Sequence, residues 1–416
     1  MEPVSEWREV PLGELVRCQS GFAFKSRDWT TAGVPVVKIR DVRLGVVRLD
    51  GVSFVAADTA AAAERFLLRR GDVLITMSGE IGSVGVYKHE RPALLNQRVG
   101  RFELLNSEAA DLNFLTFALQ DPAQKRYFES VAYGVAQPNI SPSLIGRARM
   151  RIPSLVTQRR IAAILSAFDE LIEINERRTE LLEDLARALY REWFVHFRFP
   201  GHEDVELVGS ELGPIPEGWE VRSFKSVAQF VNGFAFKPAH HDSVGRPIIK
   251  IKELKQGVTL ATPRNAGTEL DPRYLVEPGD LLFSWSADLG VYLWPGEGGL
   301  LNQHLFRVAP LPDLTREFLY HALQSALPAF RSRAEGTTMK HIKRSALDEV
   351  KLAVPSRDLV SRVSAGLAAL HGEAILLHQS CAALAAIRDL LLPRLVTGRI
   401  DLSDIDLGIL TPTEFE

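Results

Sequence analysis

The stretch GVPVVKIRDV at residues 33–42 has a second copy in the same chain, GRPIIKIKEL at residues 245–254. The pentapeptide GFAFK also occurs twice, at residues 21–25 and 233–237, with the same offset of 212 residues (233 − 21). Self-similarity at a fixed separation indicates a duplicated structural unit. The sequence therefore predicts a chain built from two similar halves.

The duplication continues in order along nearly the whole chain. RFLLRRGDVLITMSGEIG from residue 65 matches RYLVEPGDLLFSWSADLG from residue 273, and LLNQR from residue 94 matches LLNQH from residue 300. RIPSLVTQRRIAAIL from residue 151 matches LAVPSRDLVSRVSAG from residue 352 when Pro153 is aligned with Pro355. The offset falls stepwise from 212 to 202 (355 − 153), as expected if small deletions accumulated in the second copy.

Each copy begins with a predicted globular part of mixed structure. Short β-rich runs such as PVVKI and DVLITM alternate with Gly, Asp and Pro breaks, which is typical of strands bounded by turns. One helical stretch, LNFLTFALQ in the first copy and REFLYHALQ in the second, accompanies them. The predicted fold class of each globular part is α+β.

A long helix is predicted to follow each globular part. Residues 158–194 contain no Pro or Gly, and Asn175 and Thr179 interrupt the apolar seam as polar residues that fix register commonly do. The seam residues recur at heptad spacing: Ile161, Leu165, Phe168, Ile172, Leu182, Ala186, Leu189 and Trp193. The second copy repeats the spacing with Val363, Leu367, Leu370, Ala374, Leu377, Cys381, Leu384 and Leu391. Two such helices can bury their seams against each other, although two helices of a helical subdomain without a spacing role are the alternative.

Composition favours a globular chain of two or three domains, because 416 residues exceed one ordinary core and 46% are hydrophobic. We expect no membrane span, since no run approaches the apolar length of a bilayer, and no secretory signal at the N-terminus. Two cysteines far apart, Cys18 and Cys381, favour a reduced, cytoplasmic setting. A net charge of −3 neither indicates nor excludes nucleic-acid binding.

Catalytic motifs are missing from the sequence. It has no G-x-x-x-x-G-K-[ST] phosphate loop, no G-x-G-x-x-G after a strand, and no H-E-x-x-H or C-x-x-C metal pattern. Asp242, Glu253 and Lys255 have the loose spacing of a metal-dependent nuclease, but the first copy has Thr30, Asp41 and Arg43 in their places. We therefore predict no catalytic residues and no metal site.

The chain resembles the specificity subunit of type I restriction–modification systems over essentially its whole length. The resemblance is carried by the helix QRRIAAILSAFDELIEINERRTELLEDLARALYREWFVHF, the connector ELGPIPEGWEV, the GD segments at Gly71 and Gly279, and the terminal LLPRLVTGRIDLS. It implies a non-catalytic subunit with two target-recognition domains, each binding one half of a bipartite double-stranded DNA sequence. The two helices would form an antiparallel coiled coil within an internal pseudo-two-fold repeat.

The resemblance also implies domain limits and partners. We expect a first target-recognition domain at residues 1–152, a first spacer helix at 153–200, the connector and second domain at 201–355, and the second helix and tail at 356–416. Two methyltransferase subunits would dock on the helices and restriction subunits would join them. S-adenosylmethionine, ATP and Mg²⁺ would then belong to those partners, with no cofactor in this chain.

Four pairs of segments share a repeat position and carry side chains suited to DNA. Base recognition requires bidentate donors and acceptors, and phosphates bind Lys, Arg, Ser and Thr. The candidate DNA-binding residues are Lys25, Ser26, Ser78, Glu80, Asn96, Gln97, Arg98, Tyr133, Gln137, Asn139, Ser141, Lys237, Ser286, Asn302, Gln303, His304, Thr337, Thr338, Lys340 and His341. The fourth pair, AYGVAQPNIS and AEGTTMKHIK, differs most between the copies, so we expect it to distinguish two half-sites.

Two other function classes remain open from the residues alone. A self-contained nuclease or methyltransferase fragment is disfavoured by the missing motifs. A coiled-coil scaffold without DNA binding would leave the candidate residues without a role, and the amides of the LNQ segments have a structural alternative as buried groups that satisfy the backbone.

Overall fold

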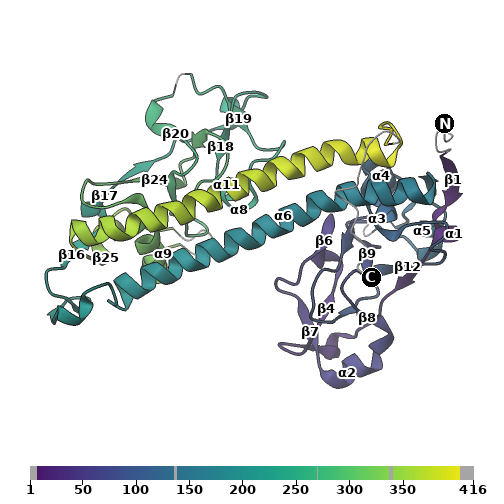
Figure 1. Ribbon diagram of the computed structural model, residues 1–416, viewed down its shortest axis with the longest axis horizontal. Coiled ribbons are helices and arrows are strands. Elements are labelled where there is room, and N and C mark those ends of the chain that lie inside the picture. Colours follow the sequence, from purple (N-terminus) through teal and green to yellow (C-terminus); the bar gives the residue numbers. More distant parts are fainter. Residues whose placement is uncertain (1–6, 135–137, 269, 337–340, 403–416) are drawn as a thin grey trace, which may run out of the picture. The chain divides into compact units, whose positions relative to one another are not determined.

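The computed structural model describes residues 7–134, 138–268, 270–336 and 341–402. The chain divides into two compact units, the first formed by Met1–Glu170 with Leu384–Glu416 and the second by Leu171–Ala383. Each unit contains one globular domain and a length of each of two long helices, α6 (Leu155–Tyr190) and α11 (Arg357–Val396) (Figure 1). The division therefore does not follow the copies, because each unit includes part of the helix that follows the other domain.

The first domain has a six-stranded sheet, a five-stranded sheet and a two-stranded ribbon. Their strand orders are β2-β12-β9-β10-β6-β5, β3-β7-β4-β11-β8 and β1-β13. The strands are β1 (Arg8–Pro11), β2 (Val16–Ser20), β3 (Trp29–Thr30), β4 (Val34–Val37), β5 (Val42–Arg43), β6 (Gly45–Val47), β7 (Ser53–Val55), β8 (Leu67–Leu68), β9 (Val73–Thr76), β10 (Val84–Val86), β11 (Ala93–Leu95), β12 (Val99–Leu104) and β13 (Arg149–Ile152).

The second domain, with its connector, has two four-stranded sheets and two ribbons. Their orders are β17-β24-β21-β22, β19-β18-β23-β20, β16-β25 and β14-β15. The strands are β14 (Leu207–Ser210), β15 (Gly213–Pro216), β16 (Glu220–Ser223), β17 (Ala228–Asn232), β18 (Arg246–Ile249), β19 (Arg264–Asn265), β20 (Leu275–Val276), β21 (Leu281–Ser284), β22 (Gly290–Leu293), β23 (Gly299–Leu301), β24 (Leu305–Pro310) and β25 (Lys351–Val354).

The two domains share their strand orders. The run β2-β12-β9-β10 corresponds to β17-β24-β21-β22, and β4-β11-β8 corresponds to β18-β23-β20. In both domains the second run contains a parallel pair, β4 with β11 and β18 with β23. The sequence repeat is therefore a structural repeat, and the predicted α+β class with two similar domains is confirmed.

The predicted helical stretch of each domain is present and begins at a side-chain cap. In α3 (Leu112–Gln120) the Asp111 carboxylate accepts the Phe114 N–H, and in α9 (Arg316–Ser332) the Thr315 hydroxyl accepts the Phe318 N–H. Asp121 then starts a separate helix, α4, whereas α9 continues through a proline. The remaining short helices are α1 (Leu12–Leu15), α2 (Ala57–Ala62), α4 (Pro122–Val131), α5 (Pro142–Gly146), α7 (Phe224–Val227), α8 (Ile251–Gln256) and α10 (Ala346–Glu349).

The two long helices start in the same way. The Ser154 hydroxyl accepts the Thr157 N–H before α6, and the Ser356 hydroxyl accepts the Leu359 N–H before α11. With its serine cap α6 begins at Leu155, three residues before the stretch 158–194 that lacks Pro and Gly and within the predicted limits 153–200. The helix continues into one π-helical turn at Arg191–Val195.

Contacts within each unit show that α6 and α11 run antiparallel. In the first unit Arg388 of α11 pairs with Asp169 of α6 at 2.6 Å. In the second unit the Asn175 amide donates to the Ser380 hydroxyl at 3.3 Å, and Arg178 pairs with Glu373 at 2.9 Å. As the residue number rises along α6, the number of its partner in α11 falls, so the two helices are antiparallel, as the coiled-coil prediction requires. The predicted polar seam residue Asn175 forms one of the hydrogen bonds between them.

Both helices complete the hydrophobic core of each domain. In the first unit Ile161 and Leu165 of α6 and Leu395 of α11 pack with core residues of the domain. In the second unit Tyr190 of α6 and Leu367 of α11 do the same. Apolar burial of this kind is the main favourable free energy of folding, so the helices stabilise the domains as well as joining them.

The connector forms a hairpin, and one expectation for α11 is wrong. In the connector, β14 and β15 pair antiparallel over residues 207–216. Among the described residues α11 contains an 18-residue window of mean hydropathy 1.4, long and apolar enough in composition to cross a bilayer, so the prediction that no run approaches this length is wrong. The same composition occurs in helices of soluble proteins, and α11 packs against α6 through the contacts above.

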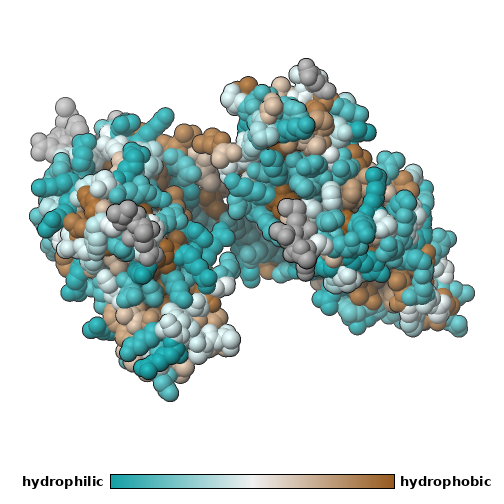
Figure 2. Space-filling view, turned by 180° about the vertical axis from the view of Figure 1, so that it is seen from behind, coloured by the Kyte–Doolittle hydropathy of each residue, from teal (hydrophilic) through white to brown (hydrophobic). Residues whose placement is uncertain are grey.

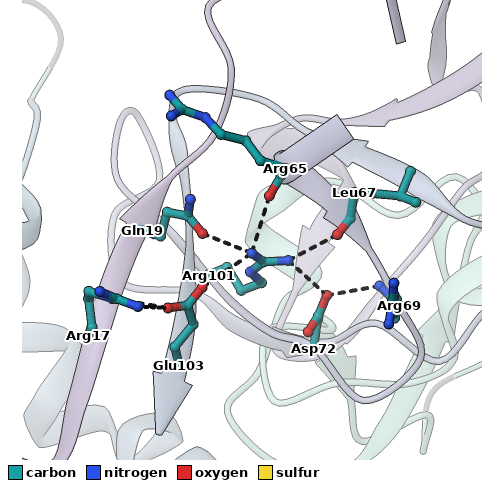
Figure 3. Close-up of polar contacts among 8 residues, drawn as sticks. All are labelled: Arg17, Gln19, Arg65, Leu67, Arg69, Asp72, Arg101 and Glu103. Atoms are coloured by element: carbon teal, nitrogen blue, oxygen red, sulfur yellow. Dashed lines mark hydrogen bonds and ion pairs between the residues drawn. The ribbon is translucent and has the colours of Figure 1, made fainter. Parts of the chain in front are cut away.

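In the first domain an arginine, Arg101, joins the six-stranded and five-stranded sheets at the GD turn, an arrangement that we call the arginine clamp (Figure 3). Arg101 on β12 donates to the Leu67 carbonyl at 2.9 Å and the Gln19 side chain at 2.8 Å, and lies 3.5 Å from the Asp72 carboxylate. Asp72, which follows Gly71, also accepts the Arg69 N–H. The Arg101 side chain is 15% exposed.

The second domain repeats this clamp with weaker contacts. Arg307 donates to the Arg273 carbonyl at 3.2 Å and lies 4.0 Å from Asp280, whose carboxylate accepts the Glu277 N–H. Its side chain is 31% exposed. The shared GD motif is thus explained by its turn and its arginine partner.

A buried histidine pair joins α9 to α11 in the second unit. The Nε2 atoms of His321 and His371 lie 3.1 Å apart, and the His321 ring stacks on Tyr190 of α6. Burial lowers the pKa of His321 to about 3 and that of His371 to about 4, with the neighbouring charge of His371 lowering the first further. Both rings are therefore neutral in the folded unit at neutral pH.

We predict that acid destabilises the second unit through these histidines. In the unfolded chain these histidines bind protons below about pH 6.5, whereas in the folded unit they stay neutral down to about pH 4. The free energy of unfolding is therefore highest above pH 6.5 and falls as the pH falls toward 4, by about 1–2 kcal/mol per histidine at pH 5. Denaturant unfolding at pH 7 and pH 5 measures the loss. His321→Phe should reduce it, whereas the exposed control His378→Gln should not; equal pH dependence in all three proteins would contradict the prediction.

We also predict that replacing Arg101 lowers the free energy of unfolding more than replacing Arg307 does. Arg101→Met leaves Asp72 and a carbonyl without their buried partner and should lower the unfolding free energy by about 2–4 kcal/mol. Arg307→Met should cost less, because its contacts are longer and more exposed. The control Arg17→Met removes a 68% exposed side chain and should change little. Thermal unfolding measures all three, and equal losses would refute this explanation.

Candidate DNA interface

The GFAFK and LNQ segments lie against each other in both units. Phe22 bridges Asn96, and the Gln97 N–H donates to the Phe22 carbonyl at 2.9 Å. In the second unit Phe234 bridges Asn302, and the Gln303 N–H donates to the Phe234 carbonyl at 2.9 Å. The structure therefore brings together two of the four predicted segments in each domain.

Glycine makes this approach possible. A Cβ at Gly21 would lie 2.2 Å from the Leu95 carbonyl oxygen, and one at Gly233 would lie 2.2 Å from that of Asn302. Such a distance excludes any side chain larger than hydrogen. The backbone at these glycines therefore packs directly against the strand end that carries the LNQ segment.

The fourth segment of each domain forms a hairpin closed by a pair of backbone hydrogen bonds. Tyr133 and Asn139 exchange N–H···O bonds of 2.9 and 2.8 Å, and Glu335 and His341 exchange two bonds of 2.9 Å. In both segments the two bonded residues are six positions apart in the sequence. In each case the loop opens with a glycine of positive φ, Gly134 or Gly336.

Each hairpin is joined to the segment that follows the GD strand. The Ile140 N–H donates to the Met77 carbonyl at 2.9 Å, and Ser78 bridges Asn139. In the second domain the Ile342 N–H donates to the Trp285 carbonyl at 3.0 Å, and Ser286 bridges His341. The predicted segment after the GD strand and the fourth predicted segment are therefore neighbours as well.

These contacts align four side chains at equivalent positions of each domain, which we call the recognition row. Paired residues of neighbouring strands have side chains on one face. The third and fourth members are in contact, since the Arg98 guanidinium lies 3.5 Å from the Ser78 hydroxyl and the His304 Nδ1 lies 2.8 Å from the Ser286 hydroxyl. The rows are Tyr133, Asn139, Ser78 and Arg98 in the first domain, and Glu335, His341, Ser286 and His304 in the second.

The rows share their buried member and differ at the others. Ser78 is 1% and Ser286 2% exposed, so the serines support the row from beneath. Tyr133 is 57% exposed, Arg98 and Glu335 are exposed, and the remaining members are partly buried. One domain thus presents a phenol, an amide and a guanidinium where the other presents a carboxylate and two imidazoles.

Several of the predicted residues have structural contacts. The Asn96 and Asn302 amides accept the N–H groups of Arg98 and His304, and Asn302 is only 3% exposed. The Ser141 hydroxyl accepts the Leu144 N–H at the start of α5. These contacts favour the structural alternative for the LNQ amides and a capping role for Ser141.

Other candidates lie at the surface around the rows. Lys25, Ser26, Lys237 and Gln97 are exposed, and Gln303 is partly buried. Glu80 is exposed and pairs with Lys125 at 3.3 Å. Gln137, Thr337, Thr338 and Lys340 lie outside the described residues.

Three residues of this region, Glu335, Lys343 and Trp285, are not among the residues predicted from the sequence. Glu335 is exposed and pairs with Lys343 at 2.8 Å, a hydrogen bond that raises the pKa of the lysine. Trp285 donates its indole N–H to the Gln303 carbonyl at 3.1 Å, and its ring lies 6.0 Å from that of His304. Aligning the fourth segments at their offset of 202 would have placed Glu335 opposite Tyr133.

The loose nuclease pattern is not assembled as a site. Glu253 is 2% exposed, accepts the Lys250 N–H and is bonded by Thr262. Asp242 accepts the Ala266 N–H, and Lys255 pairs with Asp288. Among the described residues no group of three or more His, Cys, Asp or Glu side chains is arranged to hold a metal ion.

The sequence is similar to one family of known proteins. The family model described as type I restriction modification DNA specificity domain matches residues 4–184 and 216–358. The MjaIX specificity subunit of a type I restriction enzyme from Methanocaldococcus jannaschii is 23% identical over 81% of this chain and 79% of its own length. The MjaVIII specificity subunit from the same organism is 32% identical over 44% of each chain.

A solved structure has the same fold. The S subunit of a type I restriction–modification system from M. genitalium superposes with a TM-score of 0.59 at 16% identity, over 95% of this chain and 97% of its own. At this identity the likeness concerns the fold alone. Because the family model covers most of the chain, the chain belongs to the specificity subunits of type I restriction–modification systems, the non-catalytic DNA-recognition component of these systems.

Proposed function

We propose that the chain recognises a bipartite double-stranded DNA sequence, with one recognition row for each half. The observation that carries this proposal is the pair of rows, which have the same backbone contacts and different exposed side chains. Direct recognition of bases requires different donors and acceptors for different sequences, whereas phosphate binding and scaffolding do not. The candidate residues on the surrounding surface, Lys25, Ser26, Gln97 and Lys237, would contact phosphates.

In this proposal the helices set the gap between the two half-sites. A helix of 36 residues such as α6 is about 54 Å long. Two readers held on such helices would meet one face of the DNA about one helical turn, roughly 34 Å, or more apart. The bases between the half-sites would then stay without contacts.

We propose that two methyltransferase subunits dock on the helices and that restriction subunits join this core. Apolar side chains remain exposed on α6 in the second unit: Leu171, Ile174, Leu181 and Leu185 are 48–56% exposed at heptad-like spacing. Exposed apolar stripes of this kind commonly mark protein interfaces. Figure 2 shows that hydrophobic patches are interspersed with hydrophilic ones on the surface. S-adenosylmethionine, ATP and Mg²⁺ would act in these partners, in the cytoplasm.

Loss of this chain should abolish N6-methyladenine at one bipartite motif of its host genome. Methylome sequencing of a deletion strain and its parent measures this directly. Replacing residues 1–150 by another reader should alter one half of the motif and leave the other half unchanged. Identical methylomes in a parent with active methyltransferase subunits would contradict the proposal.

Charging the exposed stripe should weaken docking of the methyltransferase subunit. Ile174→Glu with Leu181→Glu places two carboxylates in the apolar interface, and we expect at least a tenfold loss of affinity, since a buried unpaired charge is strongly unfavourable. Co-purification and calorimetry with the methyltransferase subunit measure the loss. Glu180→Gln on the same helix is the control, and unchanged affinity of the charged variant would place the interface elsewhere.

A further inference from the structure

Glu335 is the exposed end of the second recognition row and the one acidic side chain among the eight row members. We propose that its carboxylate recognises the exocyclic amino group of one base, N4 of cytosine or N6 of adenine, in the half-site bound by the second domain. This inference rests on the proposed function, because it assigns one contact within the DNA interface described above.

The backbone fixes where this carboxylate lies. Glu335 exchanges both N–H···O bonds with His341, and His341 bridges Ser286, whose hydroxyl contacts His304. The same contacts in the first domain place Tyr133 at this position. Glu335 therefore occupies an equivalent and exposed place in the row.

Its charge narrows what it can bind on DNA. A carboxylate only accepts hydrogen bonds and is repelled by phosphates, so on a DNA-binding surface it is favourable only opposite a donor. In the major groove the donors are the amino groups of cytosine and adenine, and acidic side chains accept from cytosine N4. The row therefore selects for a base with an exocyclic amine.

The lysine beside it keeps this contact accessible. Lys343 pairs with Glu335 at 2.8 Å, and the two side chains are 63% and 56% exposed. An ion pair this exposed is weak and can be exchanged for another partner. The ammonium also offsets the negative charge of Glu335 against the DNA backbone.

The test is motif determination with the assembled methyltransferase complex carrying Glu335→Ala or Glu335→Gln. Glu335→Ala should reduce discrimination at one base pair of one half-site by roughly 5- to 150-fold and leave the other half-site intact. Glu335→Gln, nearly isosteric, should move the preference at that base pair toward adenine, because an amide both donates and accepts. A wild-type cytosine at this position identifies N4 as the group bound, and a wild-type adenine identifies N6.

Glu277→Ala is the matched control. Glu277 pairs with Arg246 at 2.8 Å and is 58% exposed, against 56% for Glu335, and it precedes β21, whereas Ser286 of the row follows that strand. We expect its motif to equal that of the parent. The same experiment also determines the half-site bound by the first domain, so general misfolding of a variant would appear as loss of modification at both half-sites. If Glu335→Ala misfolds in this way, the result for Glu335→Gln decides whether Glu335 contacts the base.

The possible outcomes distinguish failure of the proposed function from failure of the assignment of Glu335. A parent complex that modifies no bipartite motif overturns the proposed function. A parent motif that Glu335→Ala and Glu335→Gln leave unchanged at every position overturns the assignment of Glu335 alone.

Discussion

Each domain of this protein depends on burying the end of a helix that belongs to the other copy of the repeat. The first domain packs on Leu392, Leu395 and Val396 of α11. The second packs on Ala186 and Tyr190 of α6 and on Phe194 of the π-helical turn that follows it. A duplicated unit of domain plus helix could fold as two independent bodies. Here the antiparallel pairing prevents this, because each hydrophobic core is incomplete without both helices.

Because the domains are stabilised by their cores and by the two helices, the side chains on their surface can differ between the copies. The stabilising contacts are shared by the copies: the GD turns, the arginine clamps, and the glycines against the strand ends. The recognition rows are built on that frame by backbone hydrogen bonds, which do not depend on side-chain identity. Tyr133 can therefore correspond to Glu335, and Arg98 to His304, without altering the fold.

The copies are not equally stabilised. Arg101 is more buried than Arg307 and has shorter contacts, while the buried pair His321 and His371 occurs in the second unit only among the described residues. The second unit should thus be the more sensitive to acid. The first unit depends more on a single ionic clamp, whose charge is surrounded by carbonyl and carboxylate oxygens.

The sequence by itself determined the duplication, the α+β class, the two long helices and the four segments around the candidate site. These features are written as local patterns: repeated motifs, strand and turn periodicity, and heptad spacing. The tertiary structure decided which of those residues face outward. Ser78, Ser286 and Asn302 have the chemistry of DNA contacts but are buried, whereas Glu335 is exposed and is joined to His341 by two backbone hydrogen bonds. Burial and cross-strand register depend on residues far apart in the chain, so no local pattern could specify them.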